Sequence, residues 1–158
     1  MSDFDIKDIW SYANNIIRSS RQMVNAGLSS LNLTSSEGNI LMHLFTQEHE
    51  VRQEDIVEQL DISKPAVSRA LKSLVNKGYV ERHKDNNDRR ASRIQLTGKA
   101  WEIRPKLEFI YNEVYSIAAR GVTEKEIAFF ISLFSRVSDN FSRVRAEMKD
   151  DWRHNIVL

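Results

Sequence analysis

The chain of 158 residues contains no cysteine, only two prolines and only five glycines. Without cysteine it can form neither disulfides nor thiolate metal sites, and it cannot sense oxidants through a thiol of its own. The scarcity of glycine and proline predicts that most of the chain is regular structure. This length fits one compact domain, or one domain with an extension.

Long apolar runs are also missing. The longest uninterrupted run, Ile127 to Ile131, is far too short to cross a bilayer. The first residues, Met1 to Asp5, lack the basic region and apolar segment of a signal peptide. We therefore expect a cytoplasmic protein that does not enter the membrane.

The sequence contains no catalytic signature. It has no Gly-x-Ser-x-Gly, no glycine-rich phosphate loop and no His-Glu-x-x-His. Its histidines, at positions 43, 49, 83 and 154, do not have the spacing of metal ligands. We expect neither enzymatic activity nor a metal or other cofactor.

Positive charge is concentrated in one part of the chain. Between Ser63 and Lys99 there are ten lysines or arginines and three acidic residues, so this segment carries +7. The whole chain carries +1, so the remainder carries −6. A near-neutral protein with one strongly basic segment is typical of a surface that meets nucleic-acid phosphates. The alternative is a hairpin that is basic but merely solvated.

Apolar periodicity predicts three helices before the basic part of the chain. The first would run from Ile6 to about Ala26, with Gly27 as its end. The second opens with the capping box Thr34 to Glu37, in which the hydroxyl and the carboxylate each bond a backbone N–H. The third spans Gln53 to Leu60.

A short basic helix and a hairpin follow. Ser63 is placed to cap the helix, Pro65 lies in its first turn, and Gly78 can end it in the left-handed conformation. Alternating residues predict antiparallel strands at 80–82 and 94–96, joined by a turn at 85–88. The predicted apolar face of the helix comprises Val67, Ala70, Leu71, Leu74 and Val75. Its polar face comprises Pro65, Ser68, Arg69, Lys72 and Asn76.

Two long helices complete the predicted fold. One would run from Thr97 to about Arg120, with a kink at Pro105 and a stop at Gly121. The capping box Thr123 to Glu126 opens the other, whose apolar residues follow a nearly heptad spacing. The expected fold class is therefore mostly α with a small β-hairpin wing, a winged helix-turn-helix flanked by terminal helices.

This combination predicts binding to double-stranded DNA, with the basic helix in the major groove and the arginine-tipped hairpin in an adjacent minor groove. Arg69 suits a bidentate contact with guanine, whereas the lysines suit phosphates. We favour Arg90 for the minor groove, braced by Asp88, although Arg89 can exchange roles with it. The candidate DNA-binding residues are Ser63, Lys64, Pro65, Ser68, Arg69, Lys72, Asp88, Arg89 and Arg90.

The terminal helices carry apolar stripes longer than a module this small can cover. We expect these helices of two subunits to pack together in a homodimer, which would present two recognition helices about 34–36 Å apart to a palindrome. The expected division is an N-terminal dimerisation helix (residues 1–33), a winged helix-turn-helix DNA-binding domain (34–97) and C-terminal dimerisation helices (98–158).

The order and spacing of these motifs resemble the MarR (multiple antibiotic resistance regulator) family of winged-helix transcription factors. The resemblance is carried by Leu33-Thr34, Asp55 to Leu60, Ser63 to Arg69, Leu74 to Val80, the wing Asp88 to Arg90, and Leu96 to Gly98. It implies a triangular homodimer joined through the first and the last two helices. It also implies a regulator, usually a repressor, released by small anionic or phenolic compounds, oxidation or metal. The chain departs from the family in lacking cysteine and in having Asn87 where the wing often has arginine.

The resemblance further implies an effector cleft between the DNA-reading module and the dimerisation helices. Aromatic side chains of the first and fifth helices could sandwich a planar ligand, with Arg18 or Arg21 holding its carboxylate. Ordinary core packing is the alternative explanation for these residues. The candidate effector-binding residues are Trp10, Tyr12, Arg18, His43 and Tyr111, with Ile16, Ile17 and Tyr115 beside them.

The leading hypothesis is a sequence-specific transcriptional regulator, a repressor that binds palindromic operators as a homodimer and responds to a small aromatic or anionic effector. The alternative is a protein–protein interaction module that uses a winged-helix scaffold and has no DNA-reading role. The basic face and the arginine wing argue against that alternative.

Overall fold

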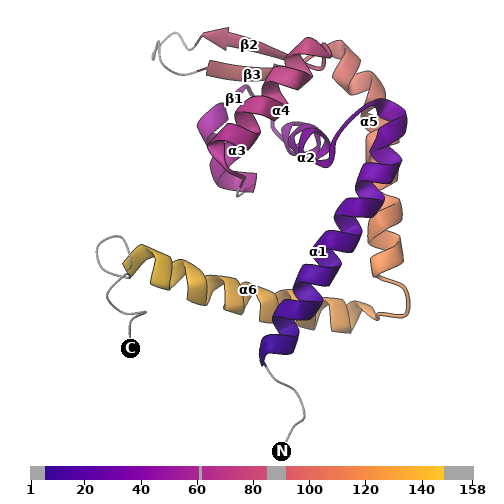
Figure 1. Cartoon of the computed structure of the whole chain (residues 1–158), viewed down its shortest axis with the longest axis vertical. Helices are drawn as coiled ribbons and strands as arrows, with labels where there is room; N and C mark the ends of the chain where they lie inside the picture. Colours follow the sequence, from indigo (N-terminus) through magenta and orange to yellow (C-terminus); the bar gives the residue numbers. More distant parts are fainter. Residues whose placement is uncertain (1–5, 61, 85–91, 148–158) are drawn as a thin grey trace, which may run out of the picture. The chain divides into compact units, whose positions relative to one another are not determined.

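A computed structural model describes residues 6–60, 62–84 and 92–147 of the chain (Figure 1). Its helices are α1 (Ile6–Leu28), α2 (Ser35–Leu44), α3 (Gln53–Leu60), α4 (Lys64–Asn76), α5 (Gly98–Ala118) and α6 (Glu124–Glu147), with a 3-10 turn η1 (Ser29–Leu31). Its strands are β1 (Val51–Arg52), β2 (Val80–Lys84) and β3 (Ser92–Leu96). The chain forms two compact units, Met1–Tyr115 and Ser116–Leu158. The predicted fold class, mostly α with a small β wing, is confirmed. The three-part functional division stays a prediction.

Local sequence signals fix three of the helix ends. Thr34 and Glu37 form the predicted capping box of α2. Thr123 and Glu126 form a second one, since each backbone N–H bonds the other side chain at 2.8 and 3.3 Å. Gly78 follows α4 with φ at +76°. Because each of these devices acts over a few residues, each could be read directly from the sequence.

The predicted end of the first helix is wrong. α1 continues through Gly27 to Leu28 and then into η1, and Asn32 takes the left-handed conformation with φ at 53°. Gly27 has a packing role instead. A Cβ added there would lie 2.6 Å from Cγ2 of Ile110, so the close approach of α1 and α5 requires glycine.

Two details of α4 also differ from the prediction. Ser63 occupies the N-cap position, but its side chain makes no capping hydrogen bond. Val75, predicted to be in the core, is 36% exposed. It directly follows the fully buried Leu74, so the turn of the helix carries its side chain to the edge of the buried face.

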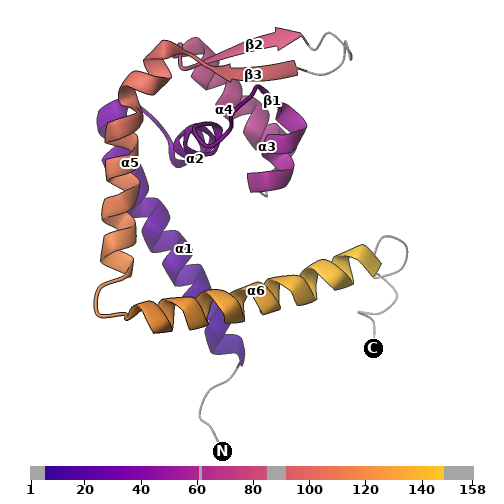
Figure 2. The same ribbon diagram turned by 180° about the vertical axis from the view of Figure 1, so that it is seen from behind.

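The sheet is antiparallel, in the order β1-β3-β2. Val80 of β2 pairs with Leu96 of β3, and Lys84 pairs with Ser92, so the predicted antiparallel pairing of these strands is confirmed. The predicted turn at 85–88 lies outside the described residues. The strand β1 was not predicted, because its two residues are too few to show an alternating pattern. Val51 pairs with Ile94, which makes β3 the central strand (Figure 2).

One hydrophobic core lies beneath this sheet and between the helices of the first unit. Its fully buried side chains come from α1, α2, α3, α4, both long strands and α5, among them Leu28, Ile40, Leu41, Ile56, Leu71, Leu74, Ile94 and Leu107. The ribbon of α5 passes through Pro105 as one helix and bends in its N-terminal half (Figure 2). This core holds α4 against the rest of the unit and leaves its opposite face in solvent.

Candidate nucleic-acid interface

The exposed face of α4 carries the residues predicted to contact DNA. Val67, Ala70, Leu71 and Leu74 are buried, as the periodicity predicted. On the other side Arg69 and Lys72 are exposed, together with Lys64 and Pro65, and Ser68 is half-buried. The buried stripe therefore fixes the rotation of the helix and presents its cationic residues to solvent.

The first turn of α4 is linked to α3 by an ion pair. Nζ of Lys64 lies 3.8 Å from Oε1 of Glu54, and both side chains are largely exposed. Such a pair is weak in water, contributing about 0–1 kcal/mol. Lys64 can therefore leave Glu54 for a phosphate at little energetic cost.

The base of the wing is joined to α3. The guanidinium of Arg82 on β2 donates a hydrogen bond to the side-chain oxygen of Gln53, at the start of α3. Nε2 of His83 lies 3.6 Å from Oε2 of Glu81 on the same strand. Arg82 was not among the predicted site residues; its place on an exposed strand position within the basic segment was the available signal. Asp88, Arg89 and Arg90 lie outside the described residues, as does Asn87, so their roles stay predictions.

A buried ionic joint, which the sequence did not predict, holds the end of α4. Nζ of Lys77 lies 2.8 Å from both carboxylate oxygens of Glu37 and 2.7 Å from the backbone oxygen of Asn32. Glu37 is only 2% exposed. We call Lys77, Glu37 and Asn32 the α4 joint, because one ammonium connects the end of α4 to the start of α2 and the end of η1.

The electrostatics of the α4 joint favour the charged carboxylate. Burial alone would raise the pKa of Glu37, but hydrogen bonds from Lys77, Ser73 and the Thr34 backbone outweigh it, so the pKa lies below its ordinary value. Lys99 adds a further bond, from its Nζ to the backbone oxygen of Lys77 at 2.6 Å. The joint therefore fixes the C-terminal end of α4 at neutral pH.

Comparisons with known proteins show what this part of the chain is similar to. Residues 31–91 match the model of the MarR family. Over these residues the chain is similar to that family. The SlyA regulator superposes on the MarR-type fold of this chain with a TM-score of 0.80, at 24% identity over 90% of this chain and 99% of that one. A MarR transcriptional regulator from Methanosarcina mazei Go1 superposes with a TM-score of 0.79, at 23% identity over 89% of this chain and 94% of that one. S. aureus MepR, in its complex with DNA, superposes with a TM-score of 0.77, at 20% identity over 87% of this chain and 99% of that one.

A cavity of about 820 Å³ gathers several of the predicted effector residues. It is lined by parts of α1, α2 and α5 and by the start of α4, and we call it the cleft. Its lining includes Arg21, His43, Tyr111, Tyr115 and Ser63. Tyr12 and Arg18 line a separate hollow on α1, and Trp10 lines neither. Ile17 borders an adjoining pocket beside both tyrosines.

The cleft combines neutral aromatic groups with one cation. Burial raises the pKa of Tyr111, whose hydroxyl donates to Oδ1 of Asn39 at 2.6 Å. Burial lowers the pKa of His43, and its Nε2 is buried without a hydrogen-bond partner. Arg21 is the only lysine or arginine among the cleft's lining residues.

None of the helices in the described ranges has the length and apolar character needed to span a bilayer. Within the same ranges, no three histidine or acidic side chains gather as potential metal ligands.

Proposed function

We propose that this chain is a sequence-specific transcriptional repressor that binds palindromic operators as a homodimer. The observation that carries the proposal is the exposed cationic face of α4, held in place by a buried apolar stripe and by the α4 joint. A likeness to the MepR structure, which is a DNA complex, supports it. The relatives named above are transcriptional regulators, and the proposal includes no enzymatic activity.

Each part of the interface has a distinct role in this proposal. α4 enters the major groove, where Arg69 contacts guanine and Ser68 a neighbouring base edge. Lys64 and Lys72 bind phosphates, which set position rather than sequence preference. The wing places Arg90, or Arg89 in its stead, in the adjacent minor groove.

Homodimer formation is proposed to cover the exposed apolar residues of the terminal helices. On α1 these are Trp10, Tyr12, Ile16 and Ile17. On α6 they are Ile127, Phe130, Ile131, Phe134, Phe141 and Val144. Large apolar patches of this kind mark surfaces that bind a partner. The dimer would work in the cytoplasm, on the DNA it regulates.

The cleft is proposed to bind a small aromatic acid that releases the repressor. Tyr111 and Tyr115, whose ring centroids lie 6.2 Å apart, would contact the ring of the ligand, and Arg21 its carboxylate. The cleft reaches Ser63, at the start of α4, so a ligand there touches the recognition helix. It would act only if it binds the DNA-incompetent arrangement more tightly.

Fluorescence anisotropy with labelled DNA from the region upstream of the protein's own gene tests the proposal. We expect saturable binding whose affinity falls linearly with salt on a double-logarithmic plot, because phosphate contacts release counterions. Absence of binding at low salt, or binding that salt does not weaken, would overturn it.

A further inference from the structure

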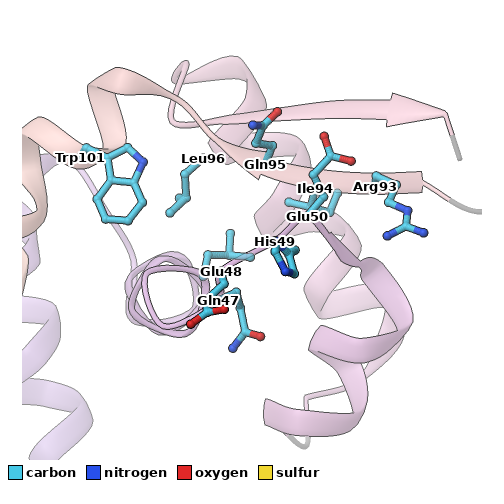
Figure 3. A pocket seen from close by; sticks show the side chains of 10 residues that line it. Gln47, Glu48, His49, Glu50, Arg93, Ile94, Gln95, Leu96 and Trp101 are labelled. Atoms are coloured by element: carbon cyan, nitrogen blue, oxygen red, sulfur yellow. The ribbon is translucent and has the colours of Figure 1, made fainter.

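A second cavity lies under β3, away from the cleft (Figure 3). Its volume of about 440 Å³ is in the range of small-molecule sites. Its walls are the end of α2 with residues 47–50, the strand β3, and the first turn of α5. It shares no lining residue with the cleft, so we treat it separately and call it the β3 cavity.

One wall of the β3 cavity is an indole held in a fixed orientation. Trp101 is 45% exposed, yet its ring centroid lies 5.2 Å from that of Phe45 and 5.3 Å from Cζ of Arg104. Arg104 is in turn held by Glu108, with Nε 2.6 Å from Oε1. Because these contacts orient the ring before any ligand arrives, little entropy is lost when a ligand packs on it.

Negative charge predominates on the rest of the lining. Glu48 and Glu50 lie on the segment that follows α2, and Arg93 on β3 is the only lysine or arginine among the described residues that line the cavity. Arg93 already has an interaction of its own, whereas neither carboxylate has an ion-pair partner within the described residues. Glu48, Glu50 and Arg93 together carry −1. Figure 3 shows Trp101 at one end of the cavity, with Leu96 beside it.

We propose that the β3 cavity binds an organic amine with an aromatic or aliphatic body. The apolar body would pack on the indole of Trp101 and on Leu96, and the ammonium would lie toward Glu48. The carboxylate of Glu50 lies on the other side of the cavity and adds negative potential there (Figure 3). The opposite charge preference separates this site from the cleft, where Arg21 favours an acid. Binding at the β3 cavity does not depend on the proposed DNA function. An effect of the amine on DNA affinity does depend on the proposed DNA function. Such an effect would act through β3, the central strand of the wing sheet.

Isothermal titration calorimetry on the full-length protein tests the site with 4-phenylbutylamine and 4-phenylbutyrate, which differ in the sign of their charge. We expect the amine to bind saturably and the acid to bind this site at least roughly tenfold more weakly. The double variant Glu48→Gln/Glu50→Gln should weaken amine binding roughly fivefold, and Trp101→Leu roughly threefold. Glu58→Gln, an exposed change on α3, is the matched control and should leave affinity unchanged.

Thermal unfolding of each variant checks that the fold is kept, and the double variant leaves the packing around Trp101 intact. Equal affinity for the two probes in the Arg21→Gln protein, whose cleft has lost its cation, or full amine affinity in the double variant, would overturn the site. DNA affinity measured with and without the amine tests the coupling separately. A change that disappears in the double variant supports coupling, and an unchanged DNA affinity with amine binding intact overturns the coupling alone. Failure to bind DNA without any ligand would concern only the proposed function.

Discussion

At the scale of single residues, Arg69 is where sequence preference is proposed to reside. Arg69→Ala should cost roughly 1–3 kcal/mol per half-site on the preferred duplex and much less on random DNA, because a guanine contact is lost. Lys72→Ala is the matched control. It should weaken binding to both duplexes alike and reduce the slope of log affinity against log salt concentration by about one, as expected for a phosphate contact. Equal losses on both duplexes for Arg69→Ala would assign that residue to phosphate binding.

The α4 joint makes a prediction about pH. The pKa of Glu37 is lowered in the folded state, so its contribution to stability is complete above about 4.5 and is lost as the pH falls through the folded value. Lys77→Met leaves a buried carboxylate unpaired and should cost about 3 kcal/mol at neutral pH. Urea unfolding at pH 7 and pH 4 should show that this cost shrinks at the lower pH. A cost that is the same at both would mean that the ion pair does not stabilise the fold.

The α4 joint also shows which residues the sequence could not predict. Thr34 and Glu37 were recognised as a capping box because they are three residues apart. Lys77 is forty residues from Glu37, and only the packed fold brings them together. The exposed cations Arg69 and Lys72 needed no such information, since helical periodicity alone separates them from the buried stripe.

At the scale of elements, the contact between α1 and α5 depends on Gly27. Gly27→Ala should destabilise the fold by roughly 1–3 kcal/mol, because the new methyl would overlap the β-branched side chain of Ile110. This cost should exceed the gain of about 1 kcal/mol that alanine brings to a helix. Gly98→Ala, with nothing within 4 Å of its added Cβ, is the control and should be neutral or slightly stabilising. Urea unfolding measures both changes in stability. A stabilising effect of Gly27→Ala would contradict the close approach of α1 and α5.

The cleft allows a test that compares two arginines of α1. Benzoate should raise the melting temperature of the protein and release it from DNA. Arg21→Gln should abolish both effects, because Arg21 lines the cleft. Arg18→Gln should keep them, because Arg18 lines a different hollow and bonds Asn15 at 3.3 Å. If Arg18→Gln abolished both effects and Arg21→Gln kept them, the acid would bind at the hollow of α1. If benzoate did not bind at millimolar concentration, the proposed aromatic-acid effector would be wrong.

The elements differ in how well the sequence predicted them. α3 was predicted with its observed bounds, because its apolar spacing and flanking signals agree. β1 escaped prediction because two residues carry no period, and it exists only through pairing with β3. Of the candidate effector residues, His43 and Tyr111 line the cleft, whereas Tyr12 and Arg18 line a separate hollow on α1. Helical periodicity shows which face of α1 is apolar but not how far along the helix the cavity extends.

At the scale of the whole molecule, the proposal requires a dimer. Phe130→Asp should produce monomers or insoluble protein, because it places a charge in the exposed apolar stripe of α6 beside Phe134. Ser132→Asp, on the opposite side of that helix, is the matched control and should leave assembly intact. Sedimentation velocity distinguishes these states. A stable, well-folded monomer for the unaltered chain would contradict the dimer.

Selection of bound duplexes from a random DNA pool tests the central claim most directly, because the protein itself then chooses the operator sequence. The account predicts enrichment of an inverted repeat whose half-site centres lie about 10 base pairs apart, one helical turn for two recognition helices. It further predicts that Arg69→Ala loses the preference for guanine within each half-site. A pool that stays random after repeated selection, with folded protein, would contradict sequence-specific binding by α4.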